Sequence, residues 1–243
     1  MIAGKYVYCI IDDRETRFSE RGFFDEEIYI VKYNSISAVV SSVPFKEIEA
    51  NVQNITSHQI VVDEARKNGA VIPVRFGVIF KDTEGVLKLL KSSCNDFKKK
   101  LEKFKNTDEY GLKIILEKKN REMIKDRVMQ NSSEIISLSK QISDSSQGKS
   151  YFLKMKLDEA VRNEALQKIE ELTGSMHREI STTALDTCLL KDDLDQIVLN
   201  SSYLVNREKY SQFKKKIKQL KSKYEPLGFT IHLSGPWAPY SFC

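Results

Sequence analysis

The 243-residue sequence predicts an α+β protein of two domains followed by a short tail. Short runs rich in β-branched and aromatic residues alternate with amphipathic helical stretches, and a hydrophobic content of 41% with 30% charged residues is typical of a globular protein. The order of elements differs between the two halves. We therefore expect a smaller N-terminal α+β domain over 1–107, a ferredoxin-like domain over 108–232 and a tail over 233–243.

The N-terminal domain opens with β-type sequence. The nearly continuous apolar run KYVYCII at 5–11 predicts a central strand. Two further β-rich runs are separated only by Asn34 and Ser35, and asparagine tolerates the positive φ of a tight turn. We expect a β-hairpin over 27–41.

A helix and a strand are expected next. Residues 54–67 have helical periodicity, with Thr56 or Ser57 as the N-cap and Gly69 after the last turn. The run AVIPVRFGVIF at 70–80 predicts one strand, because its apolar residues recur at every second position: Ile72, Val74, Phe76, Val78 and Phe80. Pro73 favours the start of this strand or a sheet edge, since proline has no amide proton to donate.

Helical patterns dominate the middle of the chain. Asp82 is expected to cap one helix whose apolar stripe comprises Val86, Leu90, Cys94, Phe97, Leu101 and Phe104. After a strand that begins at Glu109, residues 120–142 predict another helix, and the polar stretch 143–150 predicts a loop or kink. A long helix then continues to Ile180, weakened but not necessarily ended by Gly174.

The second half completes a recognisable order of elements. Two strands are expected over 182–190 and 195–207, then a helix capped by Asn206, and finally a strand over 229–233. From residue 109 the order is thus strand, helix, strand, strand, helix, strand. This is the split βαβ, or ferredoxin-like, arrangement with both helices on one face of an antiparallel sheet.

The sequence contains no combination of residues that indicates catalysis. It lacks a Gly-rich phosphate loop, a nucleophile elbow and a histidine pair at ligand spacing, and Asp192, Asp193 and Asp195 fall in a predicted turn where aspartate has a backbone role. The four cysteines are far apart and match neither a disulfide framework nor a zinc site. We expect no enzymatic activity, no cofactor and no metal.

Charge and hydropathy indicate where the protein is located and which class of partner it does not bind. The formal net charge of +5 is modest, its lysines fall mostly on the outer faces of predicted helices, and no strand has the Gly-aromatic pattern on which RNA bases stack. No apolar run approaches the roughly 20 residues that span a bilayer, and no signal peptide is recognised. We therefore expect a cytoplasmic protein that binds no nucleic acid.

Two residues of the first domain deserve separate interpretation. His58 lies on the helix face that should meet the core, which favours a buried structural imidazole over a catalytic or metal-bound one. Arg75 should point away from the apolar face of its strand. An ion pair with a partly buried carboxylate is the favoured interpretation of Arg75, and recognition of a partner is the alternative.

The tail LSGPWAPYSFC contains the only tryptophan and two of the five prolines. Each aromatic side chain of the tail would bury on the order of 150–250 Å² if the tail were docked. The prolines limit the entropy that the tail loses when it becomes ordered. We favour docking of the tail on the protein itself over direct contact with a partner. The residues concerned are Gly235, Pro236, Trp237, Pro239, Tyr240 and Phe242.

Three stretches together resemble the gas vesicle protein F/L family. They are IPVRFGVIF at 72–80, LNSSYLVNREKYSQF at 199–213 and LSGPWAPYSF at 233–242, and GKSYFLKMK at 148–156 supports them. The sequence has Ala238 where proline is common in the family and Val78 where threonine is common. The resemblance gives weight to Pro73, Arg75, Phe76, Gly77 and the aromatic residues of the tail as structural or partner-binding candidates.

The resemblance implies an accessory or minor protein of gas vesicles, the gas-filled protein shells that give aquatic microbes buoyancy. It implies association with the small hydrophobic shell protein and with other accessory proteins during assembly, and a ferredoxin-like C-terminal domain. The alternative is a regulatory protein that senses a small molecule, since ferredoxin-like domains often bind metabolites, although fold alone is a poor guide to function.

Overall fold

The computed structural model describes residues 3–14 and 16–243. Over these residues it has a mixed α/β fold with two antiparallel sheets and seven α-helices. The chain forms two compact units. The first comprises the chain up to Tyr110 together with Leu204–Glu208 and Gly235–Cys243, and the second comprises Gly111–Tyr203 and Lys209–Ser234. Segments distant in sequence therefore contribute to the first unit.

The sheet of the first unit has the strand order β2-β3-β1-β4, and β5 also pairs with β1. The expected hairpin is confirmed, with Asn34 at a φ of 52° between β2 and β3. The strands are β1 (Ala3–Asp12), β2 (Ile28–Tyr33), β3 (Ile36–Pro44), β4 (Val71–Pro73) and β5 (Ile79–Phe80).

The predicted single strand over 70–80 is wrong, because β4 ends at Pro73 and β5 begins only at Ile79. A turn lies between them, and Gly77 within it has a φ of 91°, a backbone conformation that glycine adopts without steric cost. The predicted one-face alternation is broken here as well. Phe76 packs against the cluster that contains Tyr6 and Tyr8, whereas Ile72, Val74, Val78 and Phe80 belong to the cluster that contains Val7 and Ile10.

Three helices belong to the first unit: α1 (Val52–Asn68), α2 (Thr83–Ser92) and α3 (Cys94–Lys103). The N-cap of α1 is Asn51, whose side chain accepts from the Asn54 backbone, so the predicted caps Thr56 and Ser57 are wrong. Asp82 caps α2 as expected. The predicted continuous helix after Asp82 is interrupted at Ser93, which ends α2 and precedes α3.

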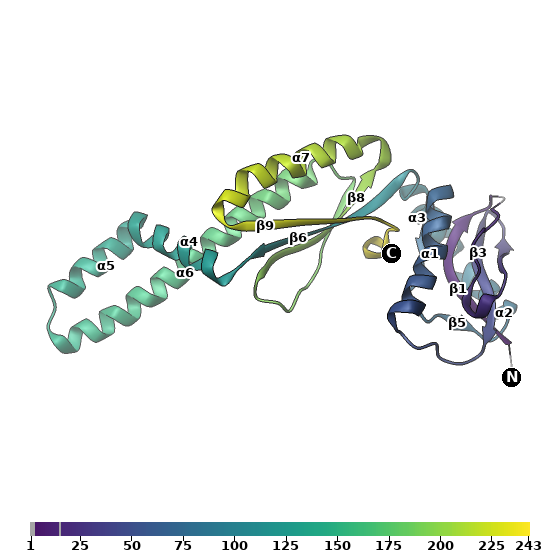
Figure 1. Cartoon of the computed structure of the whole chain (residues 1–243), viewed down its shortest axis with the longest axis horizontal. Coiled ribbons are helices and arrows are strands. Elements are labelled where there is room, and N and C mark those ends of the chain that lie inside the picture. The colour runs from purple at the N-terminus through teal and green to yellow at the C-terminus, as the bar shows by residue number, and fades with distance from the viewer. Residues whose placement is uncertain (1–2, 15) are drawn as a thin grey trace. The chain divides into compact units, whose positions relative to one another are not determined.

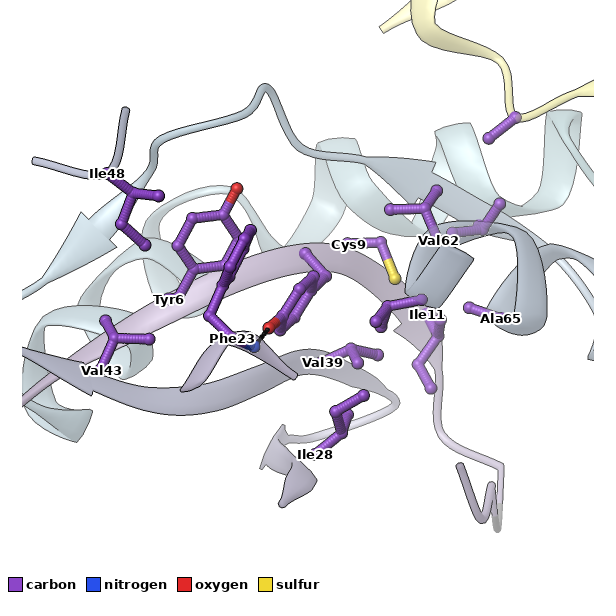
Figure 2. Packing of buried hydrophobic residues seen from close by; sticks show 14 residues of the cluster. Tyr6, Cys9, Ile11, Phe23, Ile28, Val39, Val43, Ile48, Val62 and Ala65 are labelled. Atoms are coloured by element: carbon purple, nitrogen blue, oxygen red, sulfur yellow. Dashed lines mark hydrogen bonds between the residues drawn. The ribbon is translucent and has the colours of Figure 1, made fainter. Parts of the chain in front are cut away.

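Two hydrophobic clusters lie on opposite faces of the first sheet. Tyr6, Tyr8 and Cys9 of β1 face α1, whereas Val7 and Ile10 belong to the cluster packed against α2 and α3. An irregularity in the pairing of β1 with β3 between Val7 and Cys9 explains why Tyr8 and Cys9, although adjacent, share one face. Figure 2 shows the cluster on the α1 side.

The second sheet has the strand order β7-β8-β6-β9. Its strands are β6 (Thr107–Leu116), β7 (Asp186–Leu189), β8 (Ile197–Asn206) and β9 (Phe229–Trp237). β9 therefore runs past the predicted strand end at Leu233 and includes the first residues of the expected tail. Only Tyr240–Phe242 of the tail form a separate turn, of 3-10 type.

The remaining helices are α4 (Lys118–Asn131), α5 (Ser133–Ser143), α6 (Gln147–Ser181) and α7 (Tyr210–Tyr224). The predicted helix over 120–142 is divided at Ser132, whose side chain caps α5. Gly174 lies inside α6 without ending it. Asn206 accepts a hydrogen bond from the Glu208 backbone at 2.8 Å, but it precedes a 3-10 turn, and α7 begins only at Tyr210. α4 and α5 run beside α6 (Figure 1).

None of the helices in the described ranges is both long enough and apolar enough to cross a membrane.

Candidate functional site

The turn between β4 and β5, residues 74–78, is held to β1 by its backbone. Val74 donates to the Tyr8 carbonyl at 3.0 Å, and the Val78 carbonyl accepts from Val7 at 3.0 Å. At its centre, the Gly77 N–H donates to the Tyr6 hydroxyl at 3.0 Å. These three hydrogen bonds fix both ends and the middle of the turn.

An aromatic cluster lies against the turn. The ring of Phe76 lies 6.2 Å from Tyr6, 6.1 Å from Phe23 and 5.9 Å from His58, measured between ring centroids, in edge-to-face arrangements. Tyr8 stacks on Phe23 at 5.9 Å and its hydroxyl accepts from the Phe23 backbone, the hydrogen bond drawn in Figure 2. Such pairs contribute about 0.5–1.5 kcal/mol each beyond the area that they bury. Phe76 is thereby fixed from three directions.

His58 connects α1 to this cluster. The residue is 3% exposed, and its Nδ1 lies 2.9 Å from the Tyr6 hydroxyl. Because that hydroxyl accepts from Gly77 and burial raises the pKa of Tyr6, the Tyr6 proton is donated to Nδ1, and the proton of the neutral imidazole is on Nε2. Burial lowers the pKa of His58 to about 4, opposed in part by the backbone of Val74. His58 is neutral at pH 7 and holds the turn in place.

Arg75 extends from this fixed turn into solvent. Its side chain is exposed, whereas its neighbours Val74 and Phe76 are partly buried. The expected ion pair is not found, since Arg75 pairs with no carboxylate among residues 3–14 and 16–243. The expectation assumed a position within a strand, whereas Arg75 lies in the turn between β4 and β5 and is exposed.

The C-terminal segment Gly235–Cys243 belongs to the first unit. Gly235 has a φ of 111°, and a Cβ at this position would lie 2.8 Å from the Glu109 carbonyl oxygen. Only glycine fits such a conformation and such a close approach. The backbone of β9 thus lies close beside that of its sheet neighbour β6, and the Gly235–Pro236 bond is cis.

The segment packs into both cores of its unit. Ala238 is part of the cluster that includes Cys9, Val62 and Ala65, and Phe242 packs on the opposite cluster beside Leu101 and Phe104. Lys103 Nζ lies 6.0 Å from the centre of the Phe242 ring. Pro239 is buried, whereas Pro236, Trp237 and Tyr240 are exposed. Burial of its hydroxyl nevertheless raises the pKa of Tyr240, and Cys9, Tyr6 and Asp63 raise it further.

A buried carboxylate fastens this segment. Glu109 of β6 accepts from the Ser241 backbone N–H at 2.9 Å and from the Ser241 hydroxyl at 2.6 Å. A carboxylate that accepts two hydrogen bonds in a buried position forms contacts stronger than neutral ones. Sequence patterns did not indicate Glu109, because it contacts a residue 132 positions away.

A second buried carboxylate joins three segments of the first unit. Asp108 accepts from Arg66 of α1 at 2.5 Å and from the Arg207 Nη2 at 3.0 Å, and Arg207 also donates to the Arg66 carbonyl at 2.7 Å. Asp63 supplies a further partner of Arg66 at 2.9 Å. Burial disfavours the charged Arg66, but these carboxylates prevail and raise its pKa. The role of this cluster is structural, and no sequence motif predicted it.

The second unit exposes large apolar side chains on α6. Tyr151 and Phe152 are 65% and 69% exposed, with their rings 6.1 Å apart, and Met155 is also exposed. Lys149, Lys154 and Lys156 lie in the same stretch and are likewise exposed. We call Tyr151, Phe152 and Met155 the α6 apolar patch. It falls within GKSYFLKMK, one of the stretches that resemble the family named above.

A groove of about 450 Å³ lies between α4, α6 and the start of β9 in the second unit. Its lining includes the apolar Ile124, Leu172 and Phe229, the cations Arg127 and Lys168, and the acidic Glu164. This size and the largely apolar lining fit a small apolar ligand. Within the part of the chain that the structure describes, no group of three or more His, Cys, Asp or Glu residues is arranged to hold a metal.

Solved structures share this fold. Solved structures with the same mixed α/β fold include the gas vesicle protein GvpF from Anabaena sp. PCC7120, with a TM-score of 0.84 and 19% identity over 99% of this chain and 98% of that chain. GvpF from Microcystis aeruginosa matches with a TM-score of 0.78 and 18% identity over 98% of both chains.

Sequence comparison specifies the family. The model of the family "Gas vesicle synthesis protein GvpL/GvpF" matches residues 4–243, so the chain belongs to this family. Relatives include gas vesicle protein F1 of Halobacterium salinarum, 25% identical over 100% of this chain and 93% of that protein. Gas vesicle protein F of Streptomyces sp. is 27% identical over 98% of both chains. The expected family is confirmed, and membership gives the chain a role in gas vesicle formation.

Proposed function

We propose that the chain is a non-enzymatic binding protein that engages the hydrophobic shell protein, or another accessory protein, while gas vesicles are assembled. The observation that carries this proposal is the α6 apolar patch, because two aromatic side chains and a methionine are exposed together on one helix. Aromatic and methionine side chains are enriched in protein interfaces. The proposal places the protein in the cytoplasm and at the vesicle.

The physical argument concerns the cost of exposing the patch. Full burial of a large apolar side chain contributes about 1.5–3 kcal/mol, and Tyr151 and Phe152 leave most of that unrealised in the isolated chain. Binding to a partner that displays apolar surface would bury these side chains and so gain this free energy. The surrounding lysines Lys149, Lys154 and Lys156 keep the free protein soluble and favour a partner with carboxylates around its apolar surface.

Pull-down against the shell protein and the other accessory proteins tests the proposal. The double variant Tyr151→Ser/Phe152→Ser should lose most of the captured partner without a change in melting temperature. Leu166→Ser is the matched control, since Leu166 is an exposed apolar residue on the same helix outside the patch. Failure of the wild-type protein to capture any of these proteins would refute the proposal.

A small-molecule sensor is the second candidate, and the groove beside Phe229 favours it. A ligand that binds only the folded protein raises its melting temperature with increasing saturation. A thermal-shift screen over nucleotides, amino acids and fatty acids therefore separates the two functions. A saturable shift that Phe229→Ala or Arg127→Gln abolishes would favour the sensor.

We further infer that the chain is built of two domains and that the second one is ferredoxin-like. The strand order β7-β8-β6-β9 supports this inference, since it is the order expected when two βαβ halves interlock. The helices between the strands, α4 to α6 and α7, support it as well. Limited proteolysis followed by mass spectrometry would test the two-domain division.

A further inference from the structure

We propose that Arg75 is a recognition residue that binds a carboxylate on the surface of a partner protein. The identity of that partner rests on the proposed function. Three features of the first unit lead to this inference. The turn that presents Arg75 is held in a fixed conformation, the guanidinium has no anionic partner among the described residues, and the flanking residues are apolar.

The fixed turn is the strongest of these features. Val74 and Val78 are hydrogen-bonded to β1, Gly77 is hydrogen-bonded to Tyr6, and Phe76 is packed among Tyr6, Phe23 and His58. Every neighbour of Arg75 in the turn is thereby restrained. Binding through a residue on an ordered backbone loses less entropy than binding through a mobile loop.

The chemistry of the turn selects a carboxylate. Arg75 is the only cation in the stretch VIPVRFGVIF, and arginine binds a carboxylate through two parallel hydrogen bonds. A polyanion such as nucleic acid or an anionic lipid surface calls for several cations together, and this stretch supplies one. A single acidic side chain on a protein matches the single guanidinium group that the turn presents.

Exposed apolar side chains occur on the helix that contacts the turn. Phe76 contacts His58 of α1, and the preceding turns of that helix carry the exposed Val52 and Ile55. Ile55 is three residues before His58 and so lies on the same face of the helix. An acidic residue next to apolar side chains on the partner would therefore complement both Arg75 and this part of α1. Partial exclusion of water there strengthens the ion pair.

The test compares variants of the full chain in binding to the shell protein and to each accessory protein. Arg75→Gln should weaken binding about 10- to 100-fold, as expected for the loss of a charge-assisted bidentate contact. Arg75→Lys should restore only part of the lost binding affinity, because lysine keeps the positive charge but cannot form two parallel hydrogen bonds to a carboxylate. Arg17→Gln, which changes an exposed arginine of the same unit, should bind as the wild-type protein does. All three variants should melt at the wild-type temperature.

The outcomes separate this inference from the proposed function. If the wild-type protein binds and Arg75→Gln binds equally well, the inference is wrong and the proposed function stands. If Arg75→Lys equals the wild-type protein and binding to DNA or to phosphatidylserine vesicles falls with Arg75→Gln, the ligand is a diffuse polyanion and the carboxylate is excluded. If the wild-type protein captures no partner, both proposals fail. A partner Glu or Asp changed to Arg that restores binding to Arg75→Glu would support the ion pair directly.

Discussion

Lowering the pH from 7 to 4 should destabilise the first unit through His58, in addition to any effect of the carboxylates. The imidazole is buried and neutral, with a pKa of about 4 in the folded chain against 6.5 for an unperturbed histidine. Between these values the unfolded chain binds a proton that the folded chain does not. Stability rises with pH wherever the unfolded state binds more protons, so it must fall as the pH drops through this window.

The size of the effect follows from the two pKa values. They differ by about 2.5 pH units, and each unit corresponds to about 1.4 kcal/mol, so the loss attributable to His58 is about 3 kcal/mol by pH 4. Nothing is lost above about pH 7, where both states have a neutral imidazole. Most of the loss should occur between pH 6.5 and pH 4.

Urea denaturation at pH 7, 6, 5 and 4 measures this loss if wild-type protein is compared with His58→Gln. The variant should be less stable at pH 7, because the Tyr6 contact and the packing change, but its stability should fall less steeply with pH. The difference between the two curves removes the shared contribution of the carboxylates. His232→Gln is the matched control, since it replaces an exposed histidine outside this aromatic cluster. Parallel curves for wild type and His58→Gln, or an NMR titration of His58 near 6.5, would refute the reasoning.

Three further predictions concern the contacts that hold the C-terminal segment and the buried ion pairs. Truncation after Leu233 should lower the free energy of unfolding by at least about 3 kcal/mol, because it removes the packing of Phe242 against the core and the two hydrogen bonds that Ser241 donates to the buried carboxylate of Glu109; an unchanged melt with lost partner binding would show that the segment serves a partner instead. Gly235→Ala should cost about 1–3 kcal/mol in chemical denaturation, since its positive φ and the close backbone leave no room for Cβ; a neutral effect would contradict the backbone path described. Asp108→Ala should cost about 3–5 kcal/mol, because Arg66 and Arg207 lose a buried counter-ion; a melting temperature within a degree or two of wild type would contradict a structural role.

The periodicity of the sequence predicted those helices and strands that residues close by in the chain determine. The strand at 5–11, the hairpin at Asn34 and the helix capped by Asp82 were all predictable, because short-range steric and capping rules determine them. The failures occurred where tertiary contacts override a local pattern. In the sequence Phe76 continues the alternation of a strand, although β4 ends at Pro73 and the backbone turns at Gly77 before β5 begins.

The candidate site was predictable only in part, for a related reason. The motif around Arg75 was evident in the sequence, but the direction of its side chain depends on the Tyr6–Gly77 hydrogen bond, which joins residues 71 positions apart. Asp108 depends on Arg207, which lies 99 positions away, and Glu109 depends on Ser241, which lies 132 positions away. No single-sequence rule identifies such pairs, although two adjacent acidic residues at the start of a strand that becomes buried are an unusual feature.

The contribution of Gly235–Cys243 to the first unit has a consequence for the order in which the chain folds. During synthesis the residues up to Tyr110 leave the ribosome long before this segment does, so Glu109 and the apolar side chains that receive Ala238 and Phe242 remain uncovered in the meantime. The part of the protein that is made first is therefore completed last. A chain that lacks this segment would expose that apolar surface. Quality-control proteins of the cell would bind it through the same kind of apolar contact that Ala238 and Phe242 make in the folded protein.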